Sequence, residues 1–102
     1  MKTIGTRLKN LRQRHNFTID SVAELLEIKP IDLEKIESDT KILTVSQLEV
    51  LSDLYLVDED YITDGKSSTM YITEFHQQNI DINTLYQINK ILRNIDFLVS
   101  LI

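Results

Sequence analysis

The spacing of apolar residues between positions 7 and 39 limits the fold of this chain more than any other feature. Two short amphipathic segments, 19–26 and 30–38, flank a tight turn, and a basic amphipathic segment at 4–15 precedes them. The proline that opens the second short segment fits the first turn of a helix, because its missing N–H would have no partner there. The sequence therefore predicts three packed helices, the last two joined by a short turn.

Further helices are predicted downstream. A capping-box pattern, TVSQ, starts a predicted helix at Val45–Tyr55. A shorter helix is expected at about Glu59–Thr63, and the polar residues that follow it indicate a linker. We therefore expect a first domain at 1–65 and a C-terminal dimerisation segment at 66–102.

The C-terminal segment combines a strand signal with a long helix. Residues 69–75 (TMYITEF) are rich in β-branched and aromatic side chains, which predicts a short strand. The helix expected at about 82–101 carries a heptad seam, whose apolar side would be buried by pairing with a second copy. The alternative is that this helix folds back on its own domain. The seam consists of Leu85, Ile88, Leu92, Ile95, Val99 and Ile102.

Composition argues against several classes of site. The chain has no cysteine, which removes disulfides and thiolate ligands, and its two histidines, His15 and His76, lie far apart in sequence. No apolar run approaches the roughly 20 residues that cross a bilayer, and the basic start MKTIGTRLKN lacks the apolar core of a signal peptide. We therefore expect a cytoplasmic protein without membrane contact, metal, cofactor or enzymatic activity.

The net charge of −5 is unevenly distributed. Residues 1–16 hold five Lys and Arg and no acid, whereas residues 17–65 hold three Lys and thirteen acids. A polyanion would be attracted to the first helix and repelled by most of the middle of the chain. We therefore expect low general affinity for nucleic acid, with a local basic edge that is still able to position a specific contact.

Four stretches in succession resemble one known family. IGTRLKNLR is similar to its first helix, FTIDSVAELLEI to its second helix and turn, LEKIE to the later part of its third helix, and TVSQLEVLSDLYLVDEDYI to its last two helices. The family is the phage repressor and Cro group of helix-turn-helix domains, called XRE-type, and the match extends over Ile4–Gly65. The resemblance implies an all-α, five-helix repressor-like domain. It also implies a transcriptional repressor that binds double-stranded DNA as a homodimer on an inverted-repeat operator.

The resemblance also assigns roles to individual residues. Arg12 in the first helix and Glu37 at the end of the third would form an internal ion pair. Base edges would be contacted by Lys29, Pro30, Ile31, Glu34 and Lys35. Phosphates would be contacted by Thr18, Lys41 and Lys9.

Departures from the family pattern lie around the same surface. Ile19 stands where the family usually has glutamine, and Glu27 and Asp39 stand where it usually has glycine. Acids at positions 32, 34, 37 and 39 lie near a surface that should meet phosphates. These acids support a second hypothesis, a protein-binding module (an antitoxin, antirepressor or inhibitor) that keeps the scaffold and uses its acidic face on a protein partner.

The tail, TEFHQQNIDINTLYQINKILRNIDFLVSLI, has a looser resemblance of its own. It is similar to the C-terminal strand and helix of some mobile-element regulators of the same family, which are often paired with a metalloprotease. The similarity rests on INKI at Ile88–Ile91 and on RN at Arg93 and Asn94. It implies dimerisation through the tail and a protein antagonist as a further partner.

Overall fold

Helices make up the parts of the chain that the structure describes. The computed structural model describes the backbone of residues 2–66 and 81–100, and the side chains of residues 2–66 and 81–92. Within these ranges there is no strand. The strand predicted at about 69–75 lies outside them, as do Ile102 and the side chains of Ile95 and Val99. The helices are α1 (Ile4–Arg14), α2 (Ile19–Leu25), α3 (Pro30–Glu37), α4 (Val45–Tyr55), α5 (Glu59–Asp64) and α6 (Ile82–Ser100).

Threonine side chains fix the starts of α1, α2 and α4. The hydroxyls of Thr3 and Thr18 accept hydrogen bonds from the backbone N–H three residues further on, at 3.2 and 3.1 Å. Thr44 and Gln47 form both halves of the predicted capping box. These contacts satisfy N–H groups that have no partner within the helix. The predicted ends of α1 to α5 accordingly agree with the structure to within one residue.

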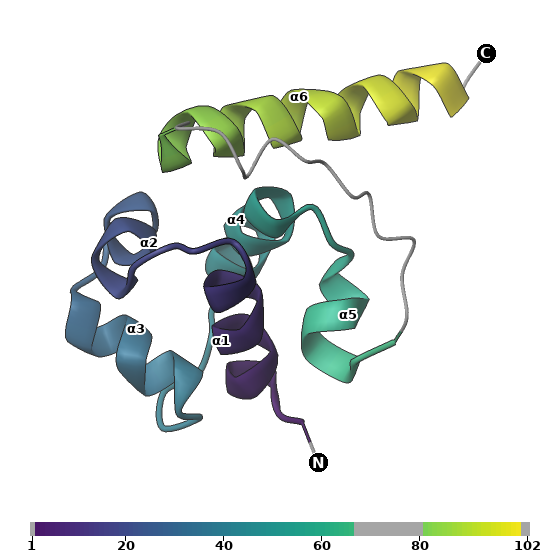
Figure 1. The fold of residues 1–102 in the computed structure, drawn as a ribbon. Coiled ribbons are helices and arrows are strands. Elements are labelled where there is room, and N and C mark those ends of the chain that lie inside the picture. The colour runs from purple at the N-terminus through teal and green to yellow at the C-terminus, as the bar shows by residue number, and fades with distance from the viewer. Residues whose placement is uncertain (1, 67–80, 101–102) are drawn as a thin grey trace.

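One apolar core joins α1 to α5. Figure 1 shows α1 in the middle of the molecule, with α2 and α3 to one side and α5 to the other. Burial of each large apolar side chain contributes roughly 1.5–3 kcal/mol, so this cluster holds the short helices in place. Its members are Leu8, Leu11, Val22, Ala23, Leu33, Ile36, Leu51, Leu54, Tyr55, Val57 and Ile62.

The last helix, α6, packs on the rest of the protein. It lies across α4 and reaches α2 (Figure 1). Leu85, predicted to face a second copy, is 2% exposed and is therefore covered within its own chain. Asn89 is also buried, and its Nδ2 donates to the carbonyl of Leu54 at 2.8 Å, near the C-terminal end of α4. The alternative of a helix folded back on its own domain thus holds for the first turns of α6, whereas Ile91 is 57% exposed.

Candidate nucleic-acid interface

The unit formed by α2 and α3 consists of two short helices joined by a tight turn. Ala23 has no exposed surface, and its small side chain allows α3 to pack closely on α2. The N–H of Ile28 donates to the carbonyl of Ala23 at 3.0 Å, and Glu27 within the turn has a positive φ of 58°. Lys29 is the N-cap of α3, and Pro30 is its first residue. The turn therefore fixes the direction in which α3 leaves α2.

The outer side of α3 carries an apolar and a basic side chain next to each other. Leu33, Ile36 and Glu37 are buried and define the inner side of the helix. Ile31 and Lys35 are four residues apart, so they share the opposite side, and Ile31 is 52% exposed. We call this pair the α3 ridge. Its chemistry suits the major groove of DNA, where an apolar group contacts the thymine methyl and a cation contacts guanine O6 and N7.

The residues predicted to contact phosphates lie around the α3 ridge but differ in what else they contact. Thr18 is exposed at the start of α2, where its hydroxyl caps the helix. Lys9 is exposed and lines an open hollow between α1 and α3. Glu34, predicted to contact a base, also lines this hollow, so it lies to one side of the ridge. Lys41 Nζ lies 3.1 Å from Asp32 Oδ1, and its charge is therefore partly neutralised within the chain.

Most of the acids around α3 have partners inside the protein. Glu37 is bound by Arg12, Asp32 is bound by the lysine of the α3–α4 loop, and Asp39 accepts hydrogen bonds from the first turn of α1. Among the described residues, Glu34 makes no such bond. The surface that α3 offers to a polyanion is therefore less repulsive than four unpaired carboxylates would make it.

Arg12 holds Glu37 in a two-pronged ion pair. Its Nε lies 2.8 Å from Glu37 Oε2, its Nη2 lies 3.0 Å from Oε1, and its Nη1 donates to the carbonyl of Phe17 at 3.0 Å. The hydrogen bond to Glu37 raises the pKa of Arg12. Burial raises the pKa of the neighbouring Tyr55, and the charge of Glu37 adds to this increase. The pair that the family resemblance implies is thus formed, and it ties α1 to the end of α3.

Arg7 has a structural role that no local sequence pattern revealed. It is 9% exposed, and its guanidinium donates to the backbone carbonyls of Ile62, Thr63 and Lys2 at 2.7–2.8 Å. Arg7 and Arg12 together account for two of the five cations that were expected to attract a polyanion to the first helix. The cations of residues 1–16 that remain exposed are Lys2, Lys9 and Arg14.

The described residues form neither a metal cluster nor a membrane-spanning helix. Among residues 2–66 and 81–92, no three histidine or acidic side chains lie close enough together to hold a metal ion. No helix in the described part of the chain has the length and apolar content needed to cross a membrane.

The chain is similar in sequence to a known transcriptional regulator. The chain is 30% identical over 78 residues to the "HTH-type transcriptional regulator RamB" of two strains of Mycobacterium tuberculosis. The match takes in 76% of this chain but only 16% of each relative, so the chain spans a small part of their length. No family model matches the chain, and no solved structure matches it. The similarity, together with the geometry of α2 and α3, supports a helix-turn-helix family for this protein.

Proposed function

We propose that this protein is a sequence-specific DNA-binding transcriptional regulator of the XRE type, acting as a repressor. The observation that carries the proposal is the α3 ridge: Ile31 and Lys35 face solvent on a helix whose other side is fixed by the core and by Arg12. The similarity to a helix-turn-helix regulator supports the same function. In this proposal the α3 ridge enters the major groove, and the start of α2 and Lys9 approach phosphates on either side.

Individual base contacts follow from the chemistry of the exposed side chains. Lys35 donates to guanine, and Ile31 packs on a thymine methyl group. Lys29 and Pro30, at the start of α3, would lie beside the first bases of the half-site. Glu34, at the side of the ridge, accepts from a cytosine amino group or keeps phosphates away from the groove between α1 and α3.

Selection of bound sequences from a random pool of double-stranded DNA tests the proposal. We expect enrichment of an inverted repeat with half-sites about 34 Å apart, one turn of the double helix. Lys35→Ala should then weaken binding to the selected site by about 1–3 kcal/mol, because a base contact is lost. The matched control is Lys66→Ala, which removes the same charge from an exposed position after α5. Equal effects of the two variants would remove Lys35 from the reading face.

We propose in addition that the protein acts as a homodimer through the outer side of α6. Ile91 is 57% exposed and Ile88 and Leu92 are half-buried, so an apolar side remains open after the first turns have packed on α4. In sequence, the seam continues through Ile95, Val99 and Ile102. A dimer would bring two third helices to one operator, so the binding free energies of the two weak half-sites would combine.

Sedimentation equilibrium of full-length variants tests this dimer. Ile91→Lys should weaken self-association without changing the unfolding free energy extrapolated to the monomer. The control Gln13→Lys adds the same charge at an exposed polar position of α1, outside the proposed interface. Leu85→Ala should instead lower stability by about 2–5 kcal/mol, because Leu85 is buried within the chain. Self-association of Ile91→Lys as tight as that of the wild type would exclude this face.

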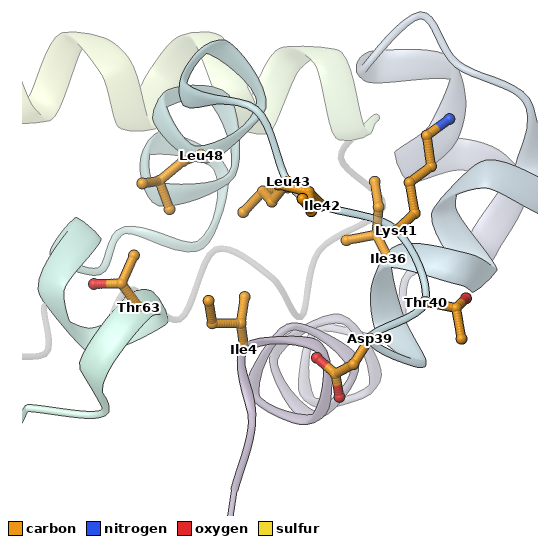
Figure 2. A pocket seen from close by; sticks show the side chains of 9 residues that line it. All are labelled: Ile4, Ile36, Asp39, Thr40, Lys41, Ile42, Leu43, Leu48 and Thr63. Carbon is orange, nitrogen blue, oxygen red and sulfur yellow. The ribbon is translucent and has the colours of Figure 1, made fainter.

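A second candidate function, a protein-binding module, is supported by the surface of the α3–α4 loop. Ile42 is 88% exposed and Val45 is 72% exposed. Ile42 lines a hollow of about 330 Å³, whose other apolar walls include Ile4, Leu43 and Leu48 (Figure 2). Under this hypothesis a partner protein covers the loop and the nearby acids, and a protein antagonist of the regulator would be recognised in the same way.

Retention on heparin or on immobilised random DNA separates the two functions. A regulator should bind at low salt and elute with a steep dependence on salt concentration, because binding releases counterions. Absence of retention at every salt concentration, together with no enrichment from the random pool, would favour the protein-binding module.

A further inference from the structure

The carboxylate of Asp39 links the C-terminal end of α3 to the first turn of α1 through hydrogen bonds. Asp39 Oδ1 accepts a hydrogen bond from the backbone N–H of Gly5 at 2.9 Å, and Oδ2 accepts one from Thr3 Oγ1 at 2.5 Å. Gly5 is the second residue of α1, so its N–H has no partner within the helix. Thr3 is the N-cap of the same helix. Asp39, which lies 34 residues after Gly5, therefore completes the cap of α1.

The backbone of Asp39 has a conformation that glycine would adopt at lower cost. Its φ is 64°, in the left-handed region where glycine is the residue of lowest cost. A glycine at this position would allow the same backbone but would supply no acceptor for the first turn of α1. Aspartate at this position adds two hydrogen bonds that glycine cannot make.

Close backbone packing at the same place leaves little freedom for α3 to move. A Cβ atom added to Gly5 would lie 2.4 Å from the carbonyl oxygen of Glu37, the last residue of α3. The first turn of α1 therefore touches the last turn of α3 directly. Figure 2 shows Asp39 and Ile4 near each other, where the chain leaves α3 beside the start of α1. With Arg12 holding the side chain of Glu37, α3 is fixed on one side by α1 at two points.

We propose that Asp39 is a positioning residue, which sets the orientation of the α3 ridge for DNA by clasping the N-terminus of α1. This inference rests on the proposed DNA-binding function. Lys35, on the ridge, is only four residues from Asp39, and its carbonyl accepts from the N–H groups of Thr40 and Lys41 at 2.9 and 3.2 Å. Asp39 therefore lies between the α3 ridge and the two residues whose N–H groups bind the Lys35 carbonyl, so a shift of Asp39 would move the end of α3.

We call the two hydrogen bonds from Thr3 and Gly5 to the Asp39 carboxylate the clasp. Two substitutions separate the effect of the clasp from that of the backbone conformation of Asp39. Asp39→Gly keeps the left-handed backbone and removes both hydrogen bonds. Asp39→Asn keeps one side-chain oxygen for the N–H of Gly5 and removes the charge, and asparagine tolerates a positive φ. Glu49→Gln is the charge control, because Glu49 is an exposed acid in α4, away from the clasp.

Two measurements on the full chain test the proposal. Amide hydrogen exchange reports the protection of the Gly5 N–H, and binding titrations give the ratio of affinity for the selected operator to that for random DNA. For Asp39→Gly we expect faster exchange at Gly5 and a specificity ratio roughly 3- to 30-fold lower. Asp39→Asn should recover part of both. Loss of an acid by itself favours binding to any polyanion, including random DNA, and Asp39→Asn and Asp39→Gly lose the same charge. The further fall in the ratio from Asp39→Asn to Asp39→Gly therefore measures the lost hydrogen bonds, and Glu49→Gln should leave the ratio unchanged.

The possible outcomes distinguish the clasp from the proposed function. Unchanged exchange at Gly5 in Asp39→Gly would show that the clasp does not form. Faster exchange with an unchanged specificity ratio would overturn the positioning role, while wild-type binding to the operator still supported the regulator. A wild-type protein that shows no preference for any DNA sequence would refute the DNA-binding function, and the positioning role with it.

Discussion

Replacement of Arg12 by methionine should destabilise the protein severely, because it leaves the carboxylate of Glu37 buried without its counter-ion. The Glu37 side chain is only 6% exposed and that of Arg12 is 12% exposed, so water cannot replace the two hydrogen bonds of the pair. The substitution also removes the donor to the carbonyl of Phe17, which follows α1. Methionine keeps much of the apolar stem of arginine, so most of the effect comes from charge and hydrogen bonding.

Breaking a buried ion pair from one side costs about 3–5 kcal/mol. A small domain is stable by roughly 5–15 kcal/mol, so Arg12→Met removes a large share of the total. At about 4 °C or more per kcal/mol for a chain of this size, the melting temperature should fall by at least roughly 12 °C. The double variant Arg12→Met, Glu37→Met should recover most of this loss, because two apolar side chains replace the pair without leaving a buried charge.

Urea unfolding followed by circular dichroism at neutral pH measures these differences in a double-mutant cycle. Arg14→Met is the matched control, since Arg14 is an exposed arginine two residues further along α1, and it should change stability by less than about 0.5 kcal/mol. The reasoning is refuted if Arg12→Met costs less than about 1 kcal/mol, the range of an exposed ion pair. It is also refuted if the double variant loses the sum of the two single losses.

Three further predictions concern backbone conformation and pH. Glu27→Gly should stabilise the fold by roughly 0.5–1 kcal/mol in urea unfolding, because φ at Glu27 is 58°, whereas Glu24→Gly within α2 should destabilise it by a similar amount. Gly5→Ala should lower the unfolding free energy by about 1–3 kcal/mol, because the new Cβ would lie 2.4 Å from the backbone carbonyl oxygen of Glu37 at the end of α3. Hydrogen bonds from the threonine hydroxyl and then the glycine N–H lower the pKa of Asp39 below 3.8. Its stabilising contribution should therefore be complete above that pH and lost as the pH falls toward the lowered pKa, so the difference in unfolding free energy between wild type and Asp39→Asn should shrink on acidification; a constant difference would contradict this.

Local patterns were sufficient to predict the helices and the turn between α2 and α3. Apolar spacing, threonine caps and a proline at the start of α3 act within a few residues of each other, so they can be recognised in the sequence alone. The capping box of α4 is an example, since Thr44 and Gln47 satisfy each other's neighbouring N–H groups. The same reasoning gave the inner and outer sides of α3 from periodicity.

Contacts between distant segments were not predictable in this way. Arg7 looked like one of several surface cations, but two of its three acceptors lie 55 and 56 residues away at the end of α5. Asp39 looked like an unpaired acid at a position for glycine, but its partners lie 34 and 36 residues before it. The heptad spacing predicted that Leu85 packs against a second copy of the chain. The packing of α6 on α4 shows instead that Leu85 is covered by its own chain. The charge of a residue is visible in the sequence, but its partner depends on the tertiary fold.

These long-range partners change the electrostatic argument about α3. Carboxylates near a DNA-reading helix oppose DNA less where a cation neutralises them, as Arg12 does for Glu37. Asp39 attaches α3 to α1 but keeps its charge, because its donors are neutral. The same contacts reduce the number of free cations, since Arg12 and Arg7 are bound to protein acceptors. With two arginines of α1 bound within the protein and acids such as Glu24, Glu27 and Glu34 exposed, nonspecific attraction to phosphates should be weak. Binding would then depend mainly on how well the α3 ridge fits the base edges in the major groove. The contacts that hold α3 against α1 should therefore matter more for specificity than any single phosphate contact.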